Sequence, residues 1–223
     1  KNLISLGHQI ALFRVGGGAN APFIEKFLSE EKLAGRPVKT YCNFQGAIDD
    51  FRPDAVFITN PNSRHLETAL FAAKSGCNLF IEKPLSHNRD GLEELKTLAD
   101  EKKLKIMIGY NLRWHPLLIK MKTMVADGVI GQPICANIEM GENIEDWHPW
   151  EDYRASYTAR QDLGGGVVVT LSHPIDYLRW LLGDVKSLWA FSGRLSDLEI
   201  QVEDFAEIGM QFANGVTGSL HVD

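Results

Sequence analysis

Three short apolar runs, separated by two helical patterns, constrain the fold of this chain more than any other feature of its sequence. The runs cover residues 55–59, 78–82 and 105–110, and each is rich in aliphatic or aromatic side chains. Apolar runs of this length, bounded by polar and turn residues, are typical of strands buried on both faces of a sheet. The segments between them read as helices, one ending near Lys74 and one near Lys103. This alternation predicts parallel βαβ units with right-handed crossovers, and therefore much of a doubly wound α/β sheet.

The segments between these runs also carry signals for where each helix begins. Asn60-Pro61-Asn62-Ser63 supplies the turn and N-cap side chains expected before the first helix. Asn88 or Asp90 is the expected N-cap of the second helix. The inner face of that second helix is expected to carry Leu92, Leu95 and Leu98.

Before the first of these runs, shorter elements of the same α/β type are expected. Gly16-Gly17-Gly18 lacks the spacing of a dinucleotide-binding fingerprint and is interpreted as a loop. Residues 1–7 read as the end of an amphipathic helix closed by glycine. The other predicted elements are strands over residues 9–15 and 38–41 and helices over residues 21–34 and 45–51.

After Tyr110 the pattern changes to one of helices and antiparallel strands. Asn214-Gly215 is a strong hairpin signal, and Gly164-Gly165-Gly166 leads into a single apolar helical stretch over residues 167–182. A helix over residues 116–126 and strands over residues 134–140, 188–193, 204–212 and 215–222 complete this half. We therefore predict a Rossmann-type doubly wound parallel sheet in residues 1–110, and an α+β domain with a mostly antiparallel open sheet in residues 111–223.

Composition and charge are those of a globular protein and disfavour several kinds of partner. The 223 residues are 44% hydrophobic and 23% charged, and the net charge of −6 argues against a nucleic-acid surface, which is normally basic. Cys42, Cys77 and Cys135 are widely spaced, which disfavours a disulfide framework or zinc ribbon and favours a reducing, cytoplasmic compartment. No apolar stretch reaches the length of a membrane span, and no signal peptide opens the sequence. Because the sequence starts at Lys1 and stops within a predicted strand at Asp223, we expect a fragment trimmed at both ends.

Glu82 and Lys83 end the central apolar run and are the first candidates for a functional site. Ligands of open α/β sheets bind beyond the carboxyl ends of the strands, which is where both side chains fall. Pro84 restricts Lys83 to extended backbone angles, so the amine leaves the strand tip in a restricted direction. The alternative is a solvated salt-bridging pair at the start of a loop, and these residues alone do not decide between the two.

Four motifs at predicted strand and helix ends resemble those of one enzyme family. In chain order they are Pro61-Asn62 with His65, Glu82-Lys83-Pro84, Gly109-Tyr110-Asn111-Leu112-Arg113, and Gly164-Gly165-Gly166 followed by His173-Pro174-Ile175-Asp176. Their order and spacing, across nearly the whole chain, resemble the Gfo/Idh/MocA oxidoreductases, the family of glucose–fructose oxidoreductase and inositol dehydrogenase.

The resemblance implies a fold, a reaction and a cofactor. Members of the family have an N-terminal Rossmann domain for NAD or NADP and a C-terminal open sheet that carries the substrate face and usually an oligomer interface. They typically oxidise a hydroxyl of a sugar, cyclitol or nucleotide-sugar, or reduce the corresponding ketone. For this chain the resemblance therefore implies NAD or NADP, a sugar-like substrate, and a homodimer or homotetramer.

The resemblance also implies which residues form the site. Lys83 and His173 are the expected catalytic residues, with His173 as the main acid/base and Lys83 as the partner that polarises the reacting oxygen. The two roles could be exchanged, and outside the family a lone histidine at a helix start is more often a cap or core residue. The residues expected to contact the cofactor are Arg14, Asn60, Pro61, Asn62, His65, Glu82, Lys83 and Asn111.

Three departures from the family pattern bear on function. The first strand and its Gly-x-Gly-x-x-Gly turn are missing, so these 223 residues alone are expected to bind a dinucleotide weakly or not at all. Arg14 stands where NAD-preferring relatives offer a carboxylate, so it either accommodates the 2′-phosphate of NADP or is a solvated loop residue. Thr170 stands where many relatives carry an aspartate, and this keeps open the role of that position in the chemistry.

The region around residues 146–160 holds the richest concentration of aromatic and cationic side chains. Because rings stack on sugar faces and arginine forks pair with carboxylates or diphosphates, it could bind an anionic sugar. The alternative is an irregular loop pinned to the sheet by its tryptophans, and the two are compatible. Asp176 could bind substrate, orient His173, or place a charge at a helix N-terminus. The expected substrate-binding residues are Arg113, Trp147, His148, Tyr153, Arg154, Tyr157, Arg160 and Asp176.

Two other functions compete with a simple oxidoreductase. Transient oxidation, as in epimerisation or NAD-assisted glycosidic cleavage, remains open because the family aspartate is absent. A non-catalytic sensor of cofactor levels is disfavoured by the presence of Lys83 and His173. The histidines His115, His148 and His173 lack the spacing of a recognised ligand set, so no metal site is predicted.

Overall fold

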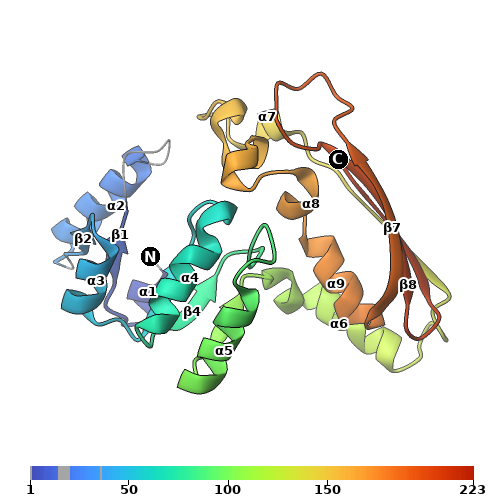
Figure 1. The fold of residues 1–223 in the computed structure, drawn as a ribbon, viewed down its shortest axis with the longest axis horizontal. Coiled ribbons are helices and arrows are strands. Elements are labelled where there is room, and N and C mark those ends of the chain that lie inside the picture. The colour runs from blue at the N-terminus through green and yellow to red at the C-terminus, as the bar shows by residue number, and fades with distance from the viewer. Residues whose placement is uncertain (1, 15–20, 36) are drawn as a thin grey trace.

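Figure 1 shows the chain as two groups of elements, a parallel α/β group from blue to green and a curved sheet with helices from yellow to red. The structure is a computed structural model that describes residues 2–14, 21–35 and 37–223. The predicted loop at Gly16-Gly17-Gly18 lies outside the described residues. The first elements are α1 (Asn2–Ser5), β1 (Ala11–Phe13), α2 (Ala21–Leu33), β2 (Lys39–Tyr41) and α3 (Phe44–Phe51), and β1 pairs with β2 in a small parallel sheet.

A second parallel sheet contains the three apolar runs that the sequence predicts as strands. They form β3 (Ala55–Ile58), β4 (Asn78–Ile81) and β5 (Ile106–Ile108), in the order β3-β4-β5. The crossover helices are α4 (His65–Lys74) and α5 (Leu92–Lys102). All pairings are parallel, so the predicted βαβ units are confirmed. The carboxyl ends of three adjacent strands therefore lie along one edge.

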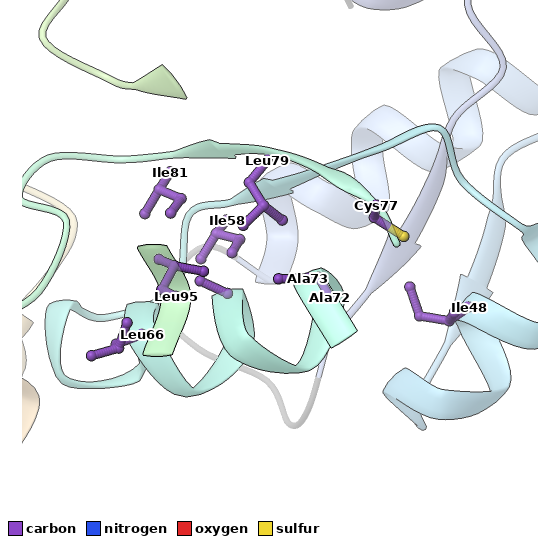
Figure 2. Packing of buried hydrophobic residues seen from close by; sticks show 10 residues of the cluster. Ile48, Ile58, Leu66, Ala72, Ala73, Cys77, Leu79, Ile81 and Leu95 are labelled. Carbon is purple, nitrogen blue, oxygen red and sulfur yellow. The ribbon is translucent and has the colours of Figure 1, made fainter. Parts of the chain in front are cut away.

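One face of this sheet forms the core of the N-terminal group. Figure 2 shows Ile58 and Ile81 on the strands facing the helices, with Ala72 and Ala73 of α4 close beneath the sheet. Alanines allow the helix to approach closely, and each buried isoleucine or leucine contributes about 1.5–3 kcal/mol. The expectation of strands buried on both faces is wrong in part, because burial alternates along β3 and Phe57 is 50% exposed.

The N-caps predicted for α4 and α5 are wrong. The residue before α4 is Arg64, and it makes no side-chain cap, while the Asn62 amide nitrogen donates to the Gly164 carbonyl. The residue before α5 is Gly91, at a φ of +84°, while the Asn88 carboxamide accepts from the backbone N–H of Asp90. Local side chains that could cap a helix are therefore recruited into the loops at the strand ends.

The C-terminal group begins with a 3₁₀ turn, η2 (Asn111–Trp114), directly after β5. Its sheet has the order β6-β9-β8-β7, with β6 parallel to β9 and the other pairs antiparallel, which confirms the predicted mostly antiparallel sheet. The Asn214-Gly215 hairpin is confirmed, and Gly215 has a φ of +92°. The elements are α6 (Pro116–Ala126), β6 (Cys135–Met140), α7 (Ile144–Trp147), η3 (Tyr153–Ala155), η4 (Tyr157–Ala159), η5 (Gln161–Leu163), α8 (Val167–Thr170), α9 (His173–Leu182), β7 (Val185–Gly193), β8 (Phe205–Phe212) and β9 (Thr217–Val222).

The two faces of this sheet differ in what covers them. Helices α8 and α9 pack on the face toward the N-terminal group, where Leu178 meets Phe212 and Leu220 in the second core (Figure 1). On the opposite face, Trp189 is 55% and Phe191 is 71% exposed. We call this second surface the outer sheet face, formed by the outward side chains of β7, β8 and β9. Its register places Trp189 opposite Gly209.

The single helix predicted over residues 167–182 is wrong, because the chain forms α8 and α9 with a break at residues 171–172. The second residue of α9 is Pro174, which has no backbone N–H and whose ring clashes with the carbonyl four residues earlier in a continuous helix. That earlier residue is Thr170. The break therefore leaves the Thr170 carbonyl without the helical partner it would otherwise have.

Candidate active site

The candidate site lies where three strand tips meet one segment of the C-terminal group. The side chain of Asn62, after β3, donates to the Gly164 carbonyl at 3.0 Å. Lys83 Nζ, after β4, donates to the Thr170 carbonyl at 2.5 Å. Arg113, after β5, donates from Nε and Nη2 to the two carboxylate oxygens of Asp176, each at 2.8 Å. Successive strands thus contact successive points along residues 164–176, at the edge where open α/β sheets bind ligands.

The triple glycine lets this segment approach the strand tips and its own neighbours. A Cβ on Gly164, whose φ is +75°, would lie 2.9 Å from the Ser63 backbone nitrogen. A Cβ on Gly165 would lie 2.4 Å from the Thr158 carbonyl oxygen. Both contacts are shorter than carbon atoms tolerate, so the close packing of this segment requires glycine.

Replacing Gly165 with alanine is expected to lower the free energy of unfolding by about 1–3 kcal/mol, because backbone atoms must move to admit the methyl group. Chemical denaturation of the two proteins measures this difference. The matched control is Gly46→Ala in α3, where a Cβ meets only Asn43 at 3.8 Å or beyond, and helix propensity predicts equal or higher stability. Equal stability of the Gly165 variant and wild type would contradict the packing argument.

Lys83 is held at the centre of the site by the break between α8 and α9. Its amine donates to the Thr170 carbonyl, the group that Pro174 leaves without a helical N–H. Burial lowers the pKa of the Lys83 amine, and the carboxylates of Glu82 and Glu142 act in the opposite direction. A lysine with a lowered pKa exchanges protons more readily near neutrality, which suits it to act on a reacting oxygen.

His173 begins α9 and shares this environment. Burial lowers the pKa of its imidazole, and the nearby Lys83 charge lowers it further, while Asp176 and Glu82 raise it. Its Nδ1 is buried and has no hydrogen-bond partner among the described residues. The His173 ring lies edge-on to Tyr110, with centroids 5.7 Å apart. A neutral imidazole at pH 7 is the form that can accept a proton.

Two residues near this pair, Tyr110 and Glu142, were not among the predicted site residues. Tyr110, at the end of the third predicted strand, packs against the His173 ring, and burial raises the pKa of its hydroxyl. Glu142 follows β6 and interacts electrostatically with the Lys83 amine. The position of Tyr110 directly before Asn111, at a strand tip, was a usable signal. Glu142 carried none, because its approach depends on how the two groups of elements pack.

The residues expected to contact a cofactor fall into two sets. Asn111 is exposed at the start of η2, and Asn60 is exposed after β3 with its amide donating to the Thr68 hydroxyl at 2.9 Å. Pro61 precedes the 3₁₀ turn η1 (Asn62–Arg64). These residues lie at the open strand edge together with Glu82, whose carboxylate accepts from the Lys83 backbone N–H at 3.2 Å.

The second set is committed to contacts within the protein. His65 is 1% exposed, and its ring nitrogens lie 2.7 Å and 2.8 Å from the carbonyl oxygens of Pro84 and Asn60. Asn62 is 3% exposed and bonded to Gly164. Both side chains therefore join the strand-end loops. Arg14 directly follows β1, and its backbone N–H donates to the Tyr41 carbonyl at 3.1 Å.

Most of the expected substrate-binding residues already have partners in the protein. Arg160 pairs with Asp162 at 2.6 Å, and Arg154 pairs with Asp152 and Glu199. An anionic ligand would have to displace these carboxylates.

The other four residues of this set that carry rings are Trp147, His148, Tyr153 and Tyr157. The Trp147 indole packs against the C-terminal core with its N–H buried, and His148 lies 3.6 Å from a Glu151 carboxylate oxygen. The Tyr153 hydroxyl accepts from the Glu199 backbone N–H. Burial raises the pKa of Tyr157, and the charges of Glu82 and Glu151 raise it further.

A cavity of about 660 Å³ adjoins the site. Its lining includes Thr170 and Leu171, residues 141–144 and residues 202–205. The charged residues that line it are all acidic: Glu142, Glu203, Asp204 and Asp223. Its size falls within the range of small-ligand pockets. Within the described ranges, no group of three or more histidine, cysteine or acidic side chains is placed to hold a metal ion.

The fold and the site together define an α/β protein of the Rossmann type with a second sheet and a ligand site at the strand tips. Comparison with known proteins identifies the family. The profile described as an oxidoreductase family with an NAD-binding Rossmann fold matches residues 24–110, and the GFO/IDH/MocA C-terminal domain profile matches residues 118–223. The chain belongs to the Gfo/Idh/MocA oxidoreductase family, which confirms the resemblance seen in the four motifs.

Individual relatives share about a quarter of their residues with this chain. It is 26% identical over 189 residues to the 1,5-anhydro-D-fructose reductase of Ensifer adhaerens, covering 82% of this chain and 54% of that protein. It is 24% identical over 218 residues to the inositol 2-dehydrogenase of Salmonella typhimurium, covering 96% of this chain and 59% of that protein.

Solved structures show the same fold. The WlbA dehydrogenase from Bordetella pertussis, in complex with NADH and UDP-GlcNAcA, matches with a TM-score of 0.77 at 19% identity, covering 96% of this chain and 67% of that one. The chain spans about half the length of the curated relatives it matches. Within the part of the chain that the structure describes, no helix is long and apolar enough to cross a membrane.

Proposed function

We propose that the protein is an NAD(P)-dependent oxidoreductase that acts on a hydroxyl or ketone of a sugar or cyclitol. The observation that carries this proposal is the pairing of Lys83 with the Thr170 carbonyl beside His173, with the pKa of both side chains lowered by burial. Two proton-exchanging groups at the tips of a Rossmann sheet suit removal of a hydroxyl proton. The family supports the same reaction class.

The strand-end residues fit the nicotinamide end of a dinucleotide. At this edge Glu82 supplies a carboxylate for ribose hydroxyls, and Asn60 and Asn111 present exposed amides. Gly109 leaves the edge open, since a Cβ there would lie 3.1 Å from the Glu82 carboxylate. When bound, the dinucleotide supplies the hydride acceptor or donor. Titration with NAD(H) and NADP(H) tests whether Arg14 favours the 2′-phosphate.

The protein's own groups handle the proton. In the oxidation direction, neutral His173 accepts the hydroxyl proton, and Lys83 hydrogen-bonds the reacting oxygen and stabilises its developing charge. In the reduction direction, protonated His173 returns the proton to the same oxygen. Both side chains are half-buried, and this burial lowers both pKa values.

The cavity favours an uncharged substrate over an anionic one. Its charged lining residues are acidic, and Arg154 and Arg160 are paired with carboxylates. Arg194, which precedes the lining residue Leu195, donates to the Ile200 carbonyl at 2.9 Å. Carboxylates accept hydrogen bonds from hydroxyl groups and repel anions. A neutral sugar or cyclitol therefore fits this lining better than a sugar acid or nucleotide-sugar.

A turnover assay with a panel of inositols, neutral sugars, sugar acids and nucleotide-sugars tests the proposal. We expect reduced nicotinamide to form with neutral polyols. Conversion of substrate without a lasting change in nicotinamide absorbance would favour transient oxidation, and dinucleotide binding without any turnover would favour a sensor. Because these 223 residues alone are expected to bind a dinucleotide weakly or not at all, the assay uses the full-length protein, and failure of that protein to bind any dinucleotide would contradict the proposal.

We also propose that the two groups of elements are separate domains divided near residue 110, and that the outer sheet face joins two copies of the chain. Each group has its own hydrophobic core, and the outer sheet face exposes Trp189 and Phe191. The free thiols Cys42, Cys77 and Cys135 are compatible with a cytoplasmic setting.

Replacing Phe191 with lysine is expected to shift the protein from dimer toward monomer, because a charge then lies in an apolar interface. Light scattering coupled to size-exclusion chromatography measures the mass of each variant. Leu117→Lys on α6 is the matched control, since Leu117 and Phe191 are both 71% exposed. A monomeric wild type would rule out the interface.

A further inference from the structure

The ion pair between Arg113 and Asp176 connects the two groups of elements next to the candidate catalytic pair. Arg113 lies on η2, one turn beyond β5, and Asp176 lies in the first turn of α9, three residues after His173. The guanidinium engages both carboxylate oxygens at 2.8 Å. The Asp176 side chain is 13% exposed and that of Arg113 is 43% exposed.

The same short turn also contacts the His173 ring. Tyr110 packs edge-on against the imidazole, and the Arg113 backbone N–H donates to the Tyr110 carbonyl at 3.2 Å. The backbone hydrogen bond ties these two contacts together. The turn after β5 therefore contacts the first turn of α9 at two points, the ring of His173 and the carboxylate of Asp176.

The bidentate geometry leaves Asp176 poorly suited to bind substrate. Both of its oxygens already accept from Arg113, and little of the side chain reaches solvent. A planar, two-point pair of this kind fixes orientation as well as distance. The pair also occupies the two Arg113 nitrogens that would grip an anionic substrate.

We propose that Arg113 and Asp176 are positioning residues that hold His173 in register with Lys83, rather than groups that bind substrate. Lys83 belongs to the tip of β4 and His173 to α9, so their relative position depends on how α9 docks against the sheet. The Arg113–Asp176 pair fixes that docking on the β5 side. The Asn62–Gly164 hydrogen bond holds the preceding end of the segment on the β3 side.

The inference rests on the proposed function, and its test separates positioning from binding. Replacing Arg113 with glutamine is expected to lower kcat by about 10–100-fold, because a small displacement of an acid/base group has effects of that size. KM for substrate and for dinucleotide is expected to change by less than about threefold, since no binding contact is lost. The double exchange Arg113→Asp with Asp176→Arg is expected to recover at least half of the lost kcat on a logarithmic scale, because it restores the pair.

A second measurement does not depend on turnover. The Asp176 carboxylate raises the pKa of His173, while burial and Lys83 lower it, and Glu82, Arg113 and Tyr110 are the other titratable groups around this turn. In protein labelled at histidine, NMR titration should therefore show a lower His173 pKa in Asp176→Asn than in wild type. Replacing Arg179, which pairs with Asp184 at the other end of α9, with glutamine is the matched control and should leave kcat and the titration unchanged.

The outcomes distinguish the inference from the function on which it rests. A rise in substrate KM of tenfold or more with little loss of kcat in Arg113→Gln would show that the arginine binds substrate, and would overturn the proposal. Unchanged kcat and an unchanged His173 titration in both single variants would overturn it as well. If wild type shows no oxidoreductase activity, the proposed function fails. The NMR titration of Asp176→Asn against the Arg179 control then still decides whether the pair acts on His173.

Discussion

Replacing Lys83 with methionine is expected to lower kcat by at least about a hundredfold, the scale of a lost proton-transfer or hydrogen-bonding group. The variant keeps an apolar stem in the same place but removes the amine that donates to the Thr170 carbonyl and is proposed to act on the reacting oxygen. Steady-state kinetics of the full protein, together with dinucleotide titration, measure the effect. Affinity for the dinucleotide should change little, because Glu82, Asn60 and Asn111 remain.

Stability gives an independent check on the Lys83 variant. The folded-state pKa of the amine is lowered mainly by burial, so at neutral pH the charged amine opposes folding. The free energy of unfolding therefore increases as pH rises through the folded pKa. Methionine removes this charge but also removes the hydrogen bond to the Thr170 carbonyl, so the two effects oppose each other and the melting temperature of the variant should stay close to that of wild type. Lys122→Met is the control, because Lys122 also donates to a backbone carbonyl, that of Trp180, away from the cleft. Unchanged turnover in Lys83→Met would remove Lys83 from the mechanism.

Replacing His173 with asparagine is expected to lower kcat/KM for alcohol oxidation by at least about a hundredfold and to remove one limb of its pH profile. The folded pKa of His173 is lowered by burial and by Lys83, so the neutral, proton-accepting form persists below the ordinary histidine value of about 6.5. In wild type, kcat/KM should therefore stay level near neutrality and fall only as pH drops through this lowered pKa.

The exposed His8, replaced with asparagine, serves as the control and should leave the profile unchanged. If the acid limb survives in His173→Asn with full activity, another group is the base. If Lys83→Met loses the limb and His173→Asn keeps it, the two roles are exchanged. Either result is read from the same set of pH–rate measurements.

These predictions share one structural cause. The segment 164–176 meets the tips of β3, β4 and β5 through Gly164, Thr170 and Asp176 in that order. Only the middle contact involves a group proposed to act on substrate. The outer contacts involve side chains whose own polar atoms are largely used within the protein. An arrangement of this kind brings one lysine and one histidine from distant parts of the chain close enough for the Lys83 charge to lower the pKa of His173.

Several features of the fold followed from the sequence because they depend on neighbouring residues. The apolar runs at 55–59, 78–82 and 105–110 became parallel strands, since short runs flanked by turn residues and helical patterns have few other arrangements. The hairpin at Asn214-Gly215 followed from the backbone freedom of glycine at a φ of +92°. The motif order identified the family, and the family profiles confirm it.

Other features required the tertiary structure because they depend on residues far apart in the chain. Local preference favoured the stretch from Asn60 to Ser63 as turn and helix cap, but the Asn62 amide nitrogen donates to a carbonyl 102 residues away. The sequence analysis listed Arg113 and Asp176 as substrate-binding residues. In the structure they form an ion pair with each other, across 63 residues of sequence. A helix pattern over residues 167–182 hid the break at which Pro174 frees the Thr170 carbonyl for Lys83.

The sequence by itself therefore determined the type of sheet, the family and the identity of Lys83 and His173 as candidates, because these are recorded in local pattern and motif order. The tertiary structure alone decided which of the neighbouring polar groups can bind a ligand and which form hydrogen bonds or ion pairs within the protein. That division follows from packing. A buried polar group must find a partner, and which partner it finds is set by the chain that folds against it.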